Sequence, residues 1–215
     1  MKGKFIVFEG IDGSGKSTQA QMLADWIEKS GQPVHRTCEP SDGMVGKLLR
    51  KVLRKEIQAD QHTIAALFLA DRLDHLNNAK TGILAKLNQG IHVISDRYYY
   101  SSYAYHSMYM PMDWVISANS ICAEMLRPDL VFYLDLTSEQ SWERIQKNRD
   151  SVELYEQVES LKMARDNYLE AIRREGEFDH VQTLSAMGEP KEIHAQIIKI
   201  TRSILGLRTH DGTNG

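Results

Sequence analysis

The chain has 215 residues and a formal net charge of −3 at pH 7; 42% of its residues are hydrophobic and 26% are charged. This length allows one domain with a substantial core, and the composition is typical of a water-soluble protein. The slightly acidic balance, with no long basic run, excludes a typical nucleic-acid-binding protein.

No segment is apolar over the roughly 18 residues that a membrane-spanning helix needs. The first residues, Met1 to Lys4, lead directly into a short apolar run and do not resemble a secretion signal. Cys38 and Cys122 are far apart in the sequence and outside metal-binding spacing, so we expect free thiols in a reducing compartment. The eight histidines are scattered without ligand spacing. We therefore expect a cytoplasmic protein with no membrane partner.

Strand-like and helix-like segments alternate along the chain. Short apolar runs predict strands at 4–9, 33–38, 91–96, 130–135 and 178–184. Apolar residues at helical spacing predict helices at 16–30, 44–53, 62–87 with a break near Gly82, 113–126, 138–148, 152–174 and 189–206. This order predicts an α/β fold, a parallel sheet of about five strands flanked by helices on both faces. We expect one domain over residues 1–206 and a disordered tail at 207–215.

A glycine-rich segment of the form G-x-x-x-x-G-K-S follows the first predicted strand and opens the first predicted helix. In this context the backbone N–H groups of the segment cradle the phosphates of a nucleotide, and the helix N-terminus favours their negative charge. Lys16 would reach the β- and γ-phosphates, and the Ser17 hydroxyl would bind Mg²⁺. The residues predicted to bind ATP here are Gly10, Ile11, Asp12, Gly13, Ser14, Gly15, Lys16, Ser17 and Thr18.

Polar residues also close the third and fourth predicted strands, at Asp96-Arg97 and at Asp135. Ligands of open parallel sheets bind at these carboxyl ends. Asp96 is placed to reach Mg²⁺ directly or through water, although a strand-capping aspartate is the alternative. Arg97 is suited to two-point contact with phosphate oxygens, although an ion pair with Asp96 or Glu39 is the alternative.

Four motifs in order resemble those of thymidylate kinases over residues 4 to about 170. The first is the phosphate loop, from Glu9 to Gln19. The others are Leu67-Phe68-x-x-Asp71-Arg72, then Asp96-Arg97-Tyr98 with Ser101 and Ala104-Tyr105, and lastly Arg127-Pro128-Asp129-Leu130. The resemblance implies a kinase of the P-loop NTPase class that transfers the γ-phosphoryl of Mg-ATP to dTMP, giving dTDP and ADP. It also implies a homodimer, for which Ile64, Leu67 and the 83–87 segment offer apolar faces that could equally be core.

The resemblance further assigns roles in the acceptor site. Phe68 would stack on the thymine ring and Arg72, one helical turn later, would hold the dTMP phosphate. Arg97 would bridge the donor and acceptor phosphates, and Asp12 would meet the 3′-hydroxyl of the sugar. The remaining acceptor residues implied are Ser101 and Ser102 at the base edge, Tyr105 against the deoxyribose where it leaves no room for a 2′-hydroxyl, and Tyr155. Core packing is the alternative for this tyrosine-rich stretch, and Tyr99 and Tyr103 are expected to be packing residues only.

A charged segment at about 143–156 resembles the family's lid, which closes over ATP and excludes water. Position 13 is glycine where some relatives carry a basic residue, so a lid arginine is expected to supply transition-state charge. Arg149 is the first choice and Arg144 the second; an ordinary solvated helix is the alternative. The catalytic residues are therefore predicted to be Lys16, Asp96, Arg97 and Arg149.

Two positions depart from the bacterial pattern. Cys38 and Leu154 stand where bacterial relatives often have arginine. Arg36 or Arg50 would compensate for the positive charge missing at position 38. Two other functions therefore stay open. One is a deoxynucleoside kinase of the same fold, which would use Glu39 as general base; Arg72 argues against it, because a nucleoside brings no phosphate. The other is a non-catalytic nucleotide-binding module that regulates a partner.

Overall fold

The fold is a five-stranded, wholly parallel sheet in the order β2-β3-β1-β4-β5. A computed structural model of the chain describes residues 2–148 and 157–206. The strands are β1 (Phe5–Glu9), β2 (Val34–Cys38), β3 (His92–Asp96), β4 (Leu130–Asp135) and β5 (Val181–Ser185). Helices connect them as expected for parallel strands. They are α1 (Lys16–Lys29), α2 (Met44–Leu53), α3 (Gln61–Asn77), α4 (Ile83–Asn88), α5 (Tyr99–His106), α6 (Met112–Met125), α7 (Ser138–Asn148), α8 (Val158–Glu175) and α9 (Pro190–Leu205).

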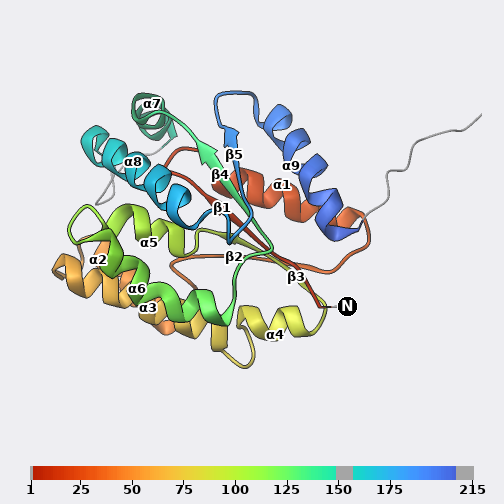
Figure 1. Cartoon of the computed structure of the whole chain (residues 1–215), viewed down its shortest axis with the longest axis horizontal. Coiled ribbons are helices and arrows are strands. Elements are labelled where there is room, and N and C mark those ends of the chain that lie inside the picture. Colours follow the sequence, from red (N-terminus) through yellow and green to blue (C-terminus); the bar gives the residue numbers. More distant parts are fainter. Residues whose placement is uncertain (1, 149–156, 207–215) are drawn as a thin grey trace, which may run out of the picture.

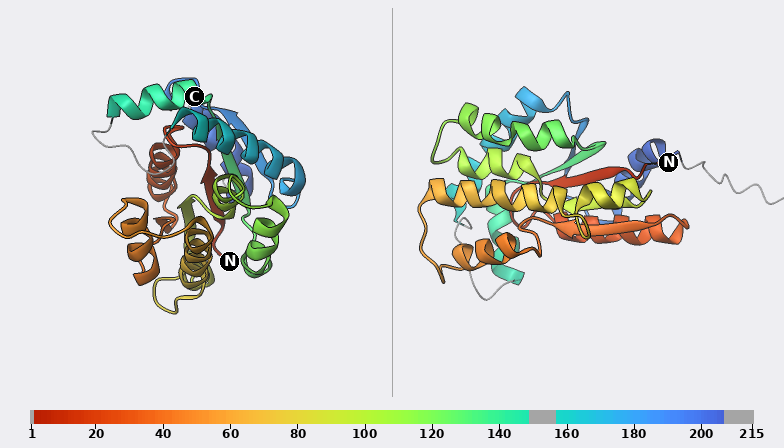
Figure 2. Two further views of the ribbon diagram at one scale, coloured as in Figure 1. Left: turned by 90° about the vertical axis from the view of Figure 1, so that its left-hand side faces the viewer. Right: turned by 90° about the horizontal axis from the view of Figure 1, so that it is seen from below.

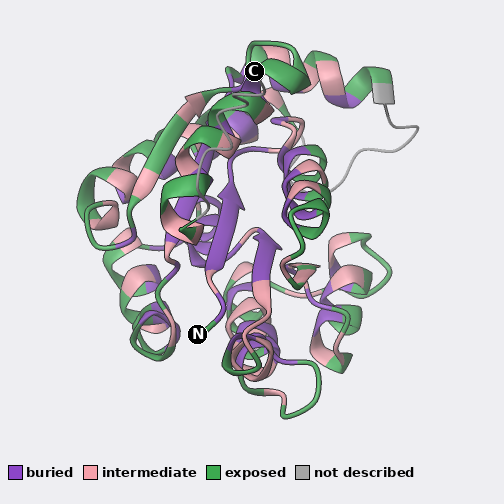
Figure 3. Ribbon diagram, turned by 90° about the vertical axis from the view of Figure 1, so that its right-hand side faces the viewer, coloured by how far each residue is buried: buried purple, intermediate pink, exposed green. Residues whose placement is uncertain are grey.

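Helices cover both faces of the sheet, which gives three layers (Figures 1 and 2). Ile6 and Phe8 of β1 point to the face covered by α1 and α9, where they pack with residues such as Leu23 and Ile197. Phe5 and Val7 point to the opposite face, which α3, α4, α5, α6 and α8 cover. The central strands are buried on both sides, as Figure 3 shows, which explains why β1 and β4 are nearly continuous apolar runs.

The predicted α/β fold with a parallel sheet is confirmed, and the differences are local. The break predicted near Gly82 is confirmed, because the chain turns between Asn78 and Gly82 and separates α3 from α4. The last strand starts at Val181 rather than 178, because the backbone N–H of Phe178 turns back to the carbonyl of Glu175. The tyrosine-rich stretch after Arg97 forms the separate helix α5.

The structure decides several smaller expectations. No helix among the described residues is long and apolar enough to cross a membrane. Both cysteines lie in the described part of the chain and are free thiols. Of the apolar faces considered for a dimer, Ile64, Ile83 and Leu87 are core residues.

Candidate active site

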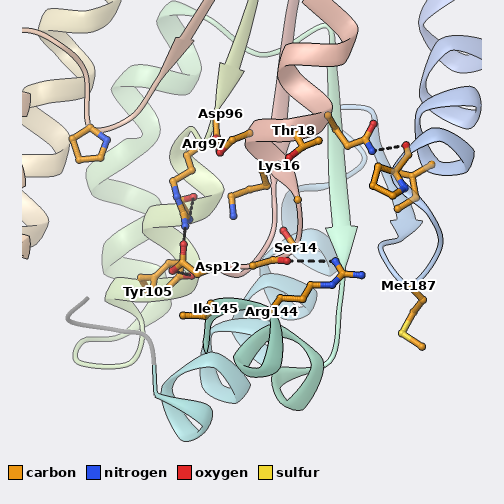
Figure 4. Close-up of a pocket in the computed structure, with 18 of the residues that line it drawn as sticks. Asp12, Ser14, Lys16, Thr18, Asp96, Arg97, Tyr105, Arg144, Ile145 and Met187 are labelled. Atoms are coloured by element: carbon orange, nitrogen blue, oxygen red, sulfur yellow. Dashed lines mark hydrogen bonds and ion pairs between the residues drawn. The ribbon is translucent and has the colours of Figure 1, made fainter. Parts of the chain in front are cut away.

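The carboxyl ends of β1, β3 and β4 meet at one edge of the sheet and open into a cavity of about 700 Å³. The parallel register sets Phe8 beside Asp96 and Phe132, so the segments that leave these strands lie together. The phosphate loop forms one wall, α5 and Phe68 of α3 a second, and α7 with the start of α9 a third. Figure 4 shows Lys16 directed into the cavity, with Arg97 and Tyr105 on one side and Arg144 and Met187 on the other.

The phosphate loop adopts a conformation that needs its glycines. Gly13 and Gly15 have φ of +76° and +93°, a region that L-residues rarely adopt. A Cβ on Gly13 would also lie 2.9 Å from the carbonyl oxygen of Ser141. Gly15 is the N-cap residue of α1 and offers no side-chain cap, so the first N–H groups of α1 face the loop. This is the arrangement in which a helix N-terminus receives a phosphate.

Lys16 is a buried cation at the centre of the loop. Its Nζ donates to the carbonyl oxygen of Ile11 at 2.9 Å. The pKa of Lys16 is lowered to about 8, chiefly by burial and then by the charge of Arg97, while Asp12 and Asp96 oppose the shift. A polyanion bound here would favour the protonated amine and raise its pKa.

Ser17 and Asp96 form the polar pair expected of a magnesium site. The Ser17 hydroxyl donates to Oδ2 of Asp96, while Oδ1 of Asp96 is buried without a hydrogen-bond partner among the described residues. A hydroxyl and a free carboxylate oxygen are suitable oxygen ligands for Mg²⁺. Within the described ranges no group of three or more His, Cys, Asp or Glu side chains could hold a metal. The residues therefore fit a metal that takes its other ligands from phosphates and water.

Arg97 lies between the phosphate loop and α5, in a backbone conformation with φ of +77°. Its Nη2 is paired with Asp12 and its Nη1 donates to Ser101 at 3.0 Å. The guanidinium carbon lies 5.2 Å from the centre of the Tyr105 ring, and the Tyr105 hydroxyl donates to Asp12 at 2.9 Å. The ion pair considered from the sequence therefore exists, but its carboxylate is Asp12 rather than Asp96 or Glu39.

Glu9 is a buried carboxylate behind this cluster, and the sequence predicted no role for it beyond beginning the phosphate-loop motif. It accepts hydrogen bonds from the Ser101 hydroxyl at 2.6 Å, the Tyr168 hydroxyl at 3.0 Å and the backbone N–H of Tyr98 at 2.7 Å. Burial raises the pKa of Glu9 to about 6, although the bond from Ser101 and the charge of Arg97 counteract that rise. Glu9 thus ties β1, the start of α5 and α8 together behind Arg97.

Arg72 is placed differently from the expectation that it holds the acceptor phosphate. Its side chain is fully buried and does not line the cavity. Nε donates to Glu39 at 2.9 Å, Nη1 donates to Ser102 and Asn119, and Nη2 contacts Glu39 and the carbonyl oxygen of Tyr98. An arginine has five N–H donors, and these contacts employ all three nitrogens. The phosphate role is therefore revised: Arg72 supports the wall of the cavity from behind.

Glu39 is the counter-ion of Arg72. Burial alone would raise its pKa, but the Arg72 guanidinium and a hydrogen bond from His75 hold the pKa below the usual value. A carboxylate held in an ion pair is a weak proton acceptor. This removes the general base on which the deoxynucleoside-kinase alternative depended.

Phe68, Ser102 and Tyr105, which the resemblance assigned to the acceptor, line the cavity together with His106. The rings of Phe68 and His106 have their centres 5.0 Å apart. His106 was missed from the sequence, since a histidine near the end of a helix has no pattern that distinguishes it. Tyr99 and Tyr103 are buried and pack with each other, as predicted.

The lid residues are described only in part. Arg144, on α7, donates to the carbonyl oxygens of Ala186 at 2.8 Å and Gly13 at 3.4 Å, so it links the phosphate loop to the segment after β5. Arg149, Leu154 and Tyr155 lie outside the described residues. The sequence also missed the far wall, from Met187 to Pro190 and Ile193, because only the fold brings this segment to the loop.

The Cys38 position borders a smaller cavity of about 240 Å³ beside Asp96 and Arg97. Of the two arginines expected to compensate there, Arg50 lines this cavity and donates to the Pro40 carbonyl at 2.6 Å and to Asp42 at 2.9 Å. Arg36 is exposed and does not line it. Positive charge at this place therefore comes from α2.

Known proteins match this chain along nearly its whole length. The family model described as "Thymidylate kinase" matches residues 8–197. A probable thymidylate kinase of Pyrococcus horikoshii is 39% identical over 214 residues, covering 96% of this chain and 100% of the relative. A probable thymidylate kinase of Thermococcus kodakarensis is 38% identical, covering 94% of this chain and 98% of the relative. One of Methanococcus aeolicus is 36% identical, covering 91% of this chain and 94% of the relative. With its phosphate loop, Asp96-Arg97 pair and Phe68 assembled in one cavity, this chain belongs to the thymidylate kinase family.

Proposed function

We propose that the protein transfers the γ-phosphoryl group of Mg-ATP to dTMP, giving dTDP and ADP. The observation that carries the proposal is the single cavity that runs from the phosphate loop to the Phe68 wall, with Arg97 and Asp12 between them. A kinase that phosphorylates a nucleotide needs such an arrangement, because two polyanions must be held in line while water is excluded.

On the donor side, the loop from Gly10 to Thr18 would bind the ATP phosphates through backbone N–H groups. Lys16 would compensate the charge of the β- and γ-phosphates, and Arg144 would hold the loop against the segment after β5. Arg149 is proposed as the lid cation that stabilises charge on the transferring group, with Arg144 as the second choice.

Ser17 and Asp96 would hold Mg²⁺ with the phosphates of ATP. The metal, when bound, neutralises developing charge on the phosphate oxygens. Asp96 also fixes the Ser17 hydroxyl by accepting its hydrogen bond. The unpartnered Oδ1 of Asp96 supports this role, since a buried carboxylate oxygen is costly to leave without a ligand.

On the acceptor side, Phe68 would stack on the thymine ring, and Ser101 and Ser102 would lie near the base edge. Arg97 would lie between the donor and acceptor phosphates. Asp12 would meet the 3′-hydroxyl and Tyr105 would exclude a 2′-hydroxyl, while Tyr155 would complete the acceptor site from the lid. Arg72 would act as a positioning residue, since its contacts hold Ser102 and the backbone of Tyr98.

ADP release with Mg-ATP tests the reaction across a panel of acceptors: dTMP, dUMP, UMP, CMP, AMP and thymidine. We expect strong preference for dTMP. Turnover of thymidine in preference to dTMP would return the deoxynucleoside-kinase alternative. ATP binding without turnover on any acceptor would support the non-catalytic module.

A homodimer in the cytoplasm is part of this proposal. Trp114, Ile121 and Met125 of α6 are 49%, 44% and 41% exposed, while Val115 and Cys122 on the other side of the same helix are buried. Large apolar side chains along one helix are typical of an interface between chains. Light scattering coupled to gel filtration should give the mass of a dimer, and Trp114→Glu should give that of a monomer.

A further inference from the structure

Behind Arg97 lies a short chain of hydrogen bonds that begins at a carboxylate without access to the cavity. Glu9 is 1% exposed and does not line the cavity, so its side chain cannot touch a ligand bound there. Its Oε2 accepts a hydrogen bond from the Ser101 hydroxyl at 2.6 Å, and the oxygen of that hydroxyl accepts one from Nη1 of Arg97 at 3.0 Å. Two hydrogen bonds therefore connect a buried carboxylate to the guanidinium that lies between the phosphate loop and α5.

The direction of the Ser101 hydroxyl decides how Arg97 is held. A hydroxyl has one hydrogen and two lone pairs. Because Ser101 donates its hydrogen to Glu9, its lone pairs remain for donors, and Nη1 of Arg97 uses one of them. A protonated Glu9 would carry a hydrogen of its own and would donate to the oxygen that now accepts from Arg97. The carboxylate form of Glu9 is therefore the form that orients Ser101 toward Arg97.

Glu9 is itself held from several sides. The backbone N–H of Tyr98 donates to its Oε1 at 2.7 Å, and the Tyr168 hydroxyl donates to its Oε2 at 3.0 Å. Tyr168 is 0% exposed and lies on α8, which a two-point ion pair from Arg165 to Asp135, at 2.8 and 2.9 Å, fastens to the end of β4. The carboxylate thus has a fixed place, as a group that orients its neighbours must have.

We propose that Glu9 is a positioning residue for phosphoryl transfer: its carboxylate fixes the Ser101 hydroxyl and, through it, the place of Arg97 between the two phosphates. The inference rests on the proposed function, because it assumes that Arg97 acts on a transferring phosphoryl group. A cation that stabilises a transition state has to be in place beforehand, since a displacement of about 1 Å can cost 10²-fold in rate. Glu9 would supply this order without touching either substrate.

A double-mutant cycle tests whether Glu9 acts through Ser101. Glu9→Gln keeps the size of the side chain but removes its charge, so kcat with dTMP should fall by about 10-fold. The KM for dTMP should change by less than about 3-fold, because Glu9 lies outside the cavity. In Ser101→Ala the intermediary is missing, so adding Glu9→Gln should lower kcat no further. Losses that multiply in the double variant would show that Glu9 only supports the fold, and would overturn the proposal.

The pH profile is a readout that a purely structural role would not move. The pKa of Glu9 is raised to about 6, chiefly by burial, while the hydrogen bond from Ser101, the charge of Arg97 and the hydrogen bond from Tyr168 counteract the rise. Lys16 of α1 is a second cation that interacts with Glu9. Because the carboxylate is the orienting form, its contribution should be complete well above pH 6 and lost as the pH falls through about 6.

The phosphate of dTMP also titrates near pH 6, so the profile is best measured as a ratio. Dividing kcat/KM of the wild-type protein by kcat/KM of Glu9→Gln cancels the ionisation of the substrate. This ratio should be about 10 at pH 8 and should approach 1 near pH 5. A ratio that stays constant with pH would overturn the proposal.

Tyr168→Phe keeps the proposal testable even if Glu9→Gln fails to fold. It retains the ring but removes a hydrogen bond that favours the carboxylate, so the acid limb of activity should move to higher pH. The matched control is Tyr100→Phe, because the Tyr100 hydroxyl donates to another buried carboxylate, Asp179, at 2.9 Å and lies outside the cavity. The control should keep the wild-type limb. Equal shifts in both variants, or no shift in Tyr168→Phe, would overturn the proposal.

A measurement without substrates separates this inference from the proposed function. In protein labelled with ¹⁵N-arginine, the side-chain resonances of Arg97, identified by their loss in Arg97→Lys, should titrate with a midpoint near pH 6, and Glu9→Gln should abolish that titration. If the wild-type protein releases no ADP with Mg-ATP and dTMP but shows this titration, the link from Glu9 to Arg97 stands and phosphoryl transfer falls. If dTMP is phosphorylated but neither Arg97 nor kcat depends on Glu9, transfer stands and the positioning role falls.

Discussion

The two ends of the cavity are built in different ways. At the phosphate end, Lys16 and Ser17 begin helix α1 after the loop that leaves β1, and Asp96 ends β3. The Ser17 hydroxyl donates to Asp96. At the base end, Phe68 and His106 come from α3 and α5, and Arg72 with Glu39 supports them from behind. One end offers charges to a ligand, whereas the other hides its charges behind an apolar wall.

This difference separates two uses of arginine. Arg97 lines the cavity and is 17% exposed at its side chain, so its contacts with Asp12 and Ser101 can be exchanged for a phosphate. Arg72 is 0% exposed and fully engaged by the protein. We therefore expect loss of Arg97 to remove activity with the fold intact, and loss of Arg72 to remove stability first.

The largest effect should come from Arg97→Ala. Removing a preorganised cation from between two phosphates should lower kcat by about 10³-fold or more, measured as ADP release at saturating dTMP and ATP. The kcat of Arg97→Lys should lie between those of Arg97→Ala and the wild-type protein, because lysine keeps the charge but lacks the planar guanidinium fork. Arg173→Ala, which breaks an exposed pair with Glu170 on α8, is the control and should keep full activity. A fall below 10-fold in Arg97→Ala would place this residue outside the reacting centre.

Arg72→Ala should lower stability at the base end of the cavity. It leaves Glu39 buried without its partner, so the free energy of unfolding in urea should fall by about 3–5 kcal/mol. Arg174→Ala removes exposed ion pairs with Glu170 and Asp113 and should change that free energy by less than about 1 kcal/mol. If Arg72→Ala is as stable as wild type and only the KM for dTMP rises, the side chain contacts the acceptor and our revision of its role is wrong.

Tyr105 sharpens the comparison because it lies where the two ends meet. Tyr105→Ala removes the ring over Arg97 and opens space for a 2′-hydroxyl. It should raise kcat/KM for the ribonucleotide that carries the same base, relative to kcat/KM for dTMP, by about 10-fold. Tyr105→Phe removes the hydroxyl that donates to Asp12 but keeps the ring, so it should retain the preference for the deoxyribonucleotide. The same ratio in Tyr105→Ala and wild type would show that the ring only packs.

The smallest effect concerns protons at the phosphate end. The pKa of Lys16 is lowered to about 8 in the free protein, and bound phosphates favour the charged amine. ATP binding near pH 8 should therefore take up a fraction of a proton, and affinity should decline as pH rises above about 8. Calorimetry in buffers of different ionisation enthalpy measures this uptake, which Lys16→Met should abolish. Proton release instead of uptake in the wild-type protein would contradict this assignment.

Most of the phosphate end could be predicted from the sequence. The strand, the glycines, Lys16 and Ser17 are contiguous, and their chemistry depends on backbone geometry that this order specifies locally. Asp96 and Arg97 could be added because the ends of parallel strands meet at one edge of a sheet. The partner of Arg97 was missed from the sequence. Asp12 comes beside it only because the backbone turns with positive φ at Arg97 itself and at the glycines of the phosphate loop.

The base end depended on tertiary structure. The spacing of Phe68 and Arg72 puts them on one side of α3, but Phe68 reaches the cavity while Arg72 turns behind it to Glu39, 33 residues away. The local sequence does not show whether an arginine lines the cavity or is buried behind it. A buried guanidinium is stable only when a carboxylate distant in the sequence is buried against it as its ion-pair partner. By itself, then, the sequence determined the parallel α/β fold and the phosphate chemistry, which follow from short-range order. Which side chains of α3 and α5 line the cavity, Phe68 and His106 among them, was decided only when the two helices packed together.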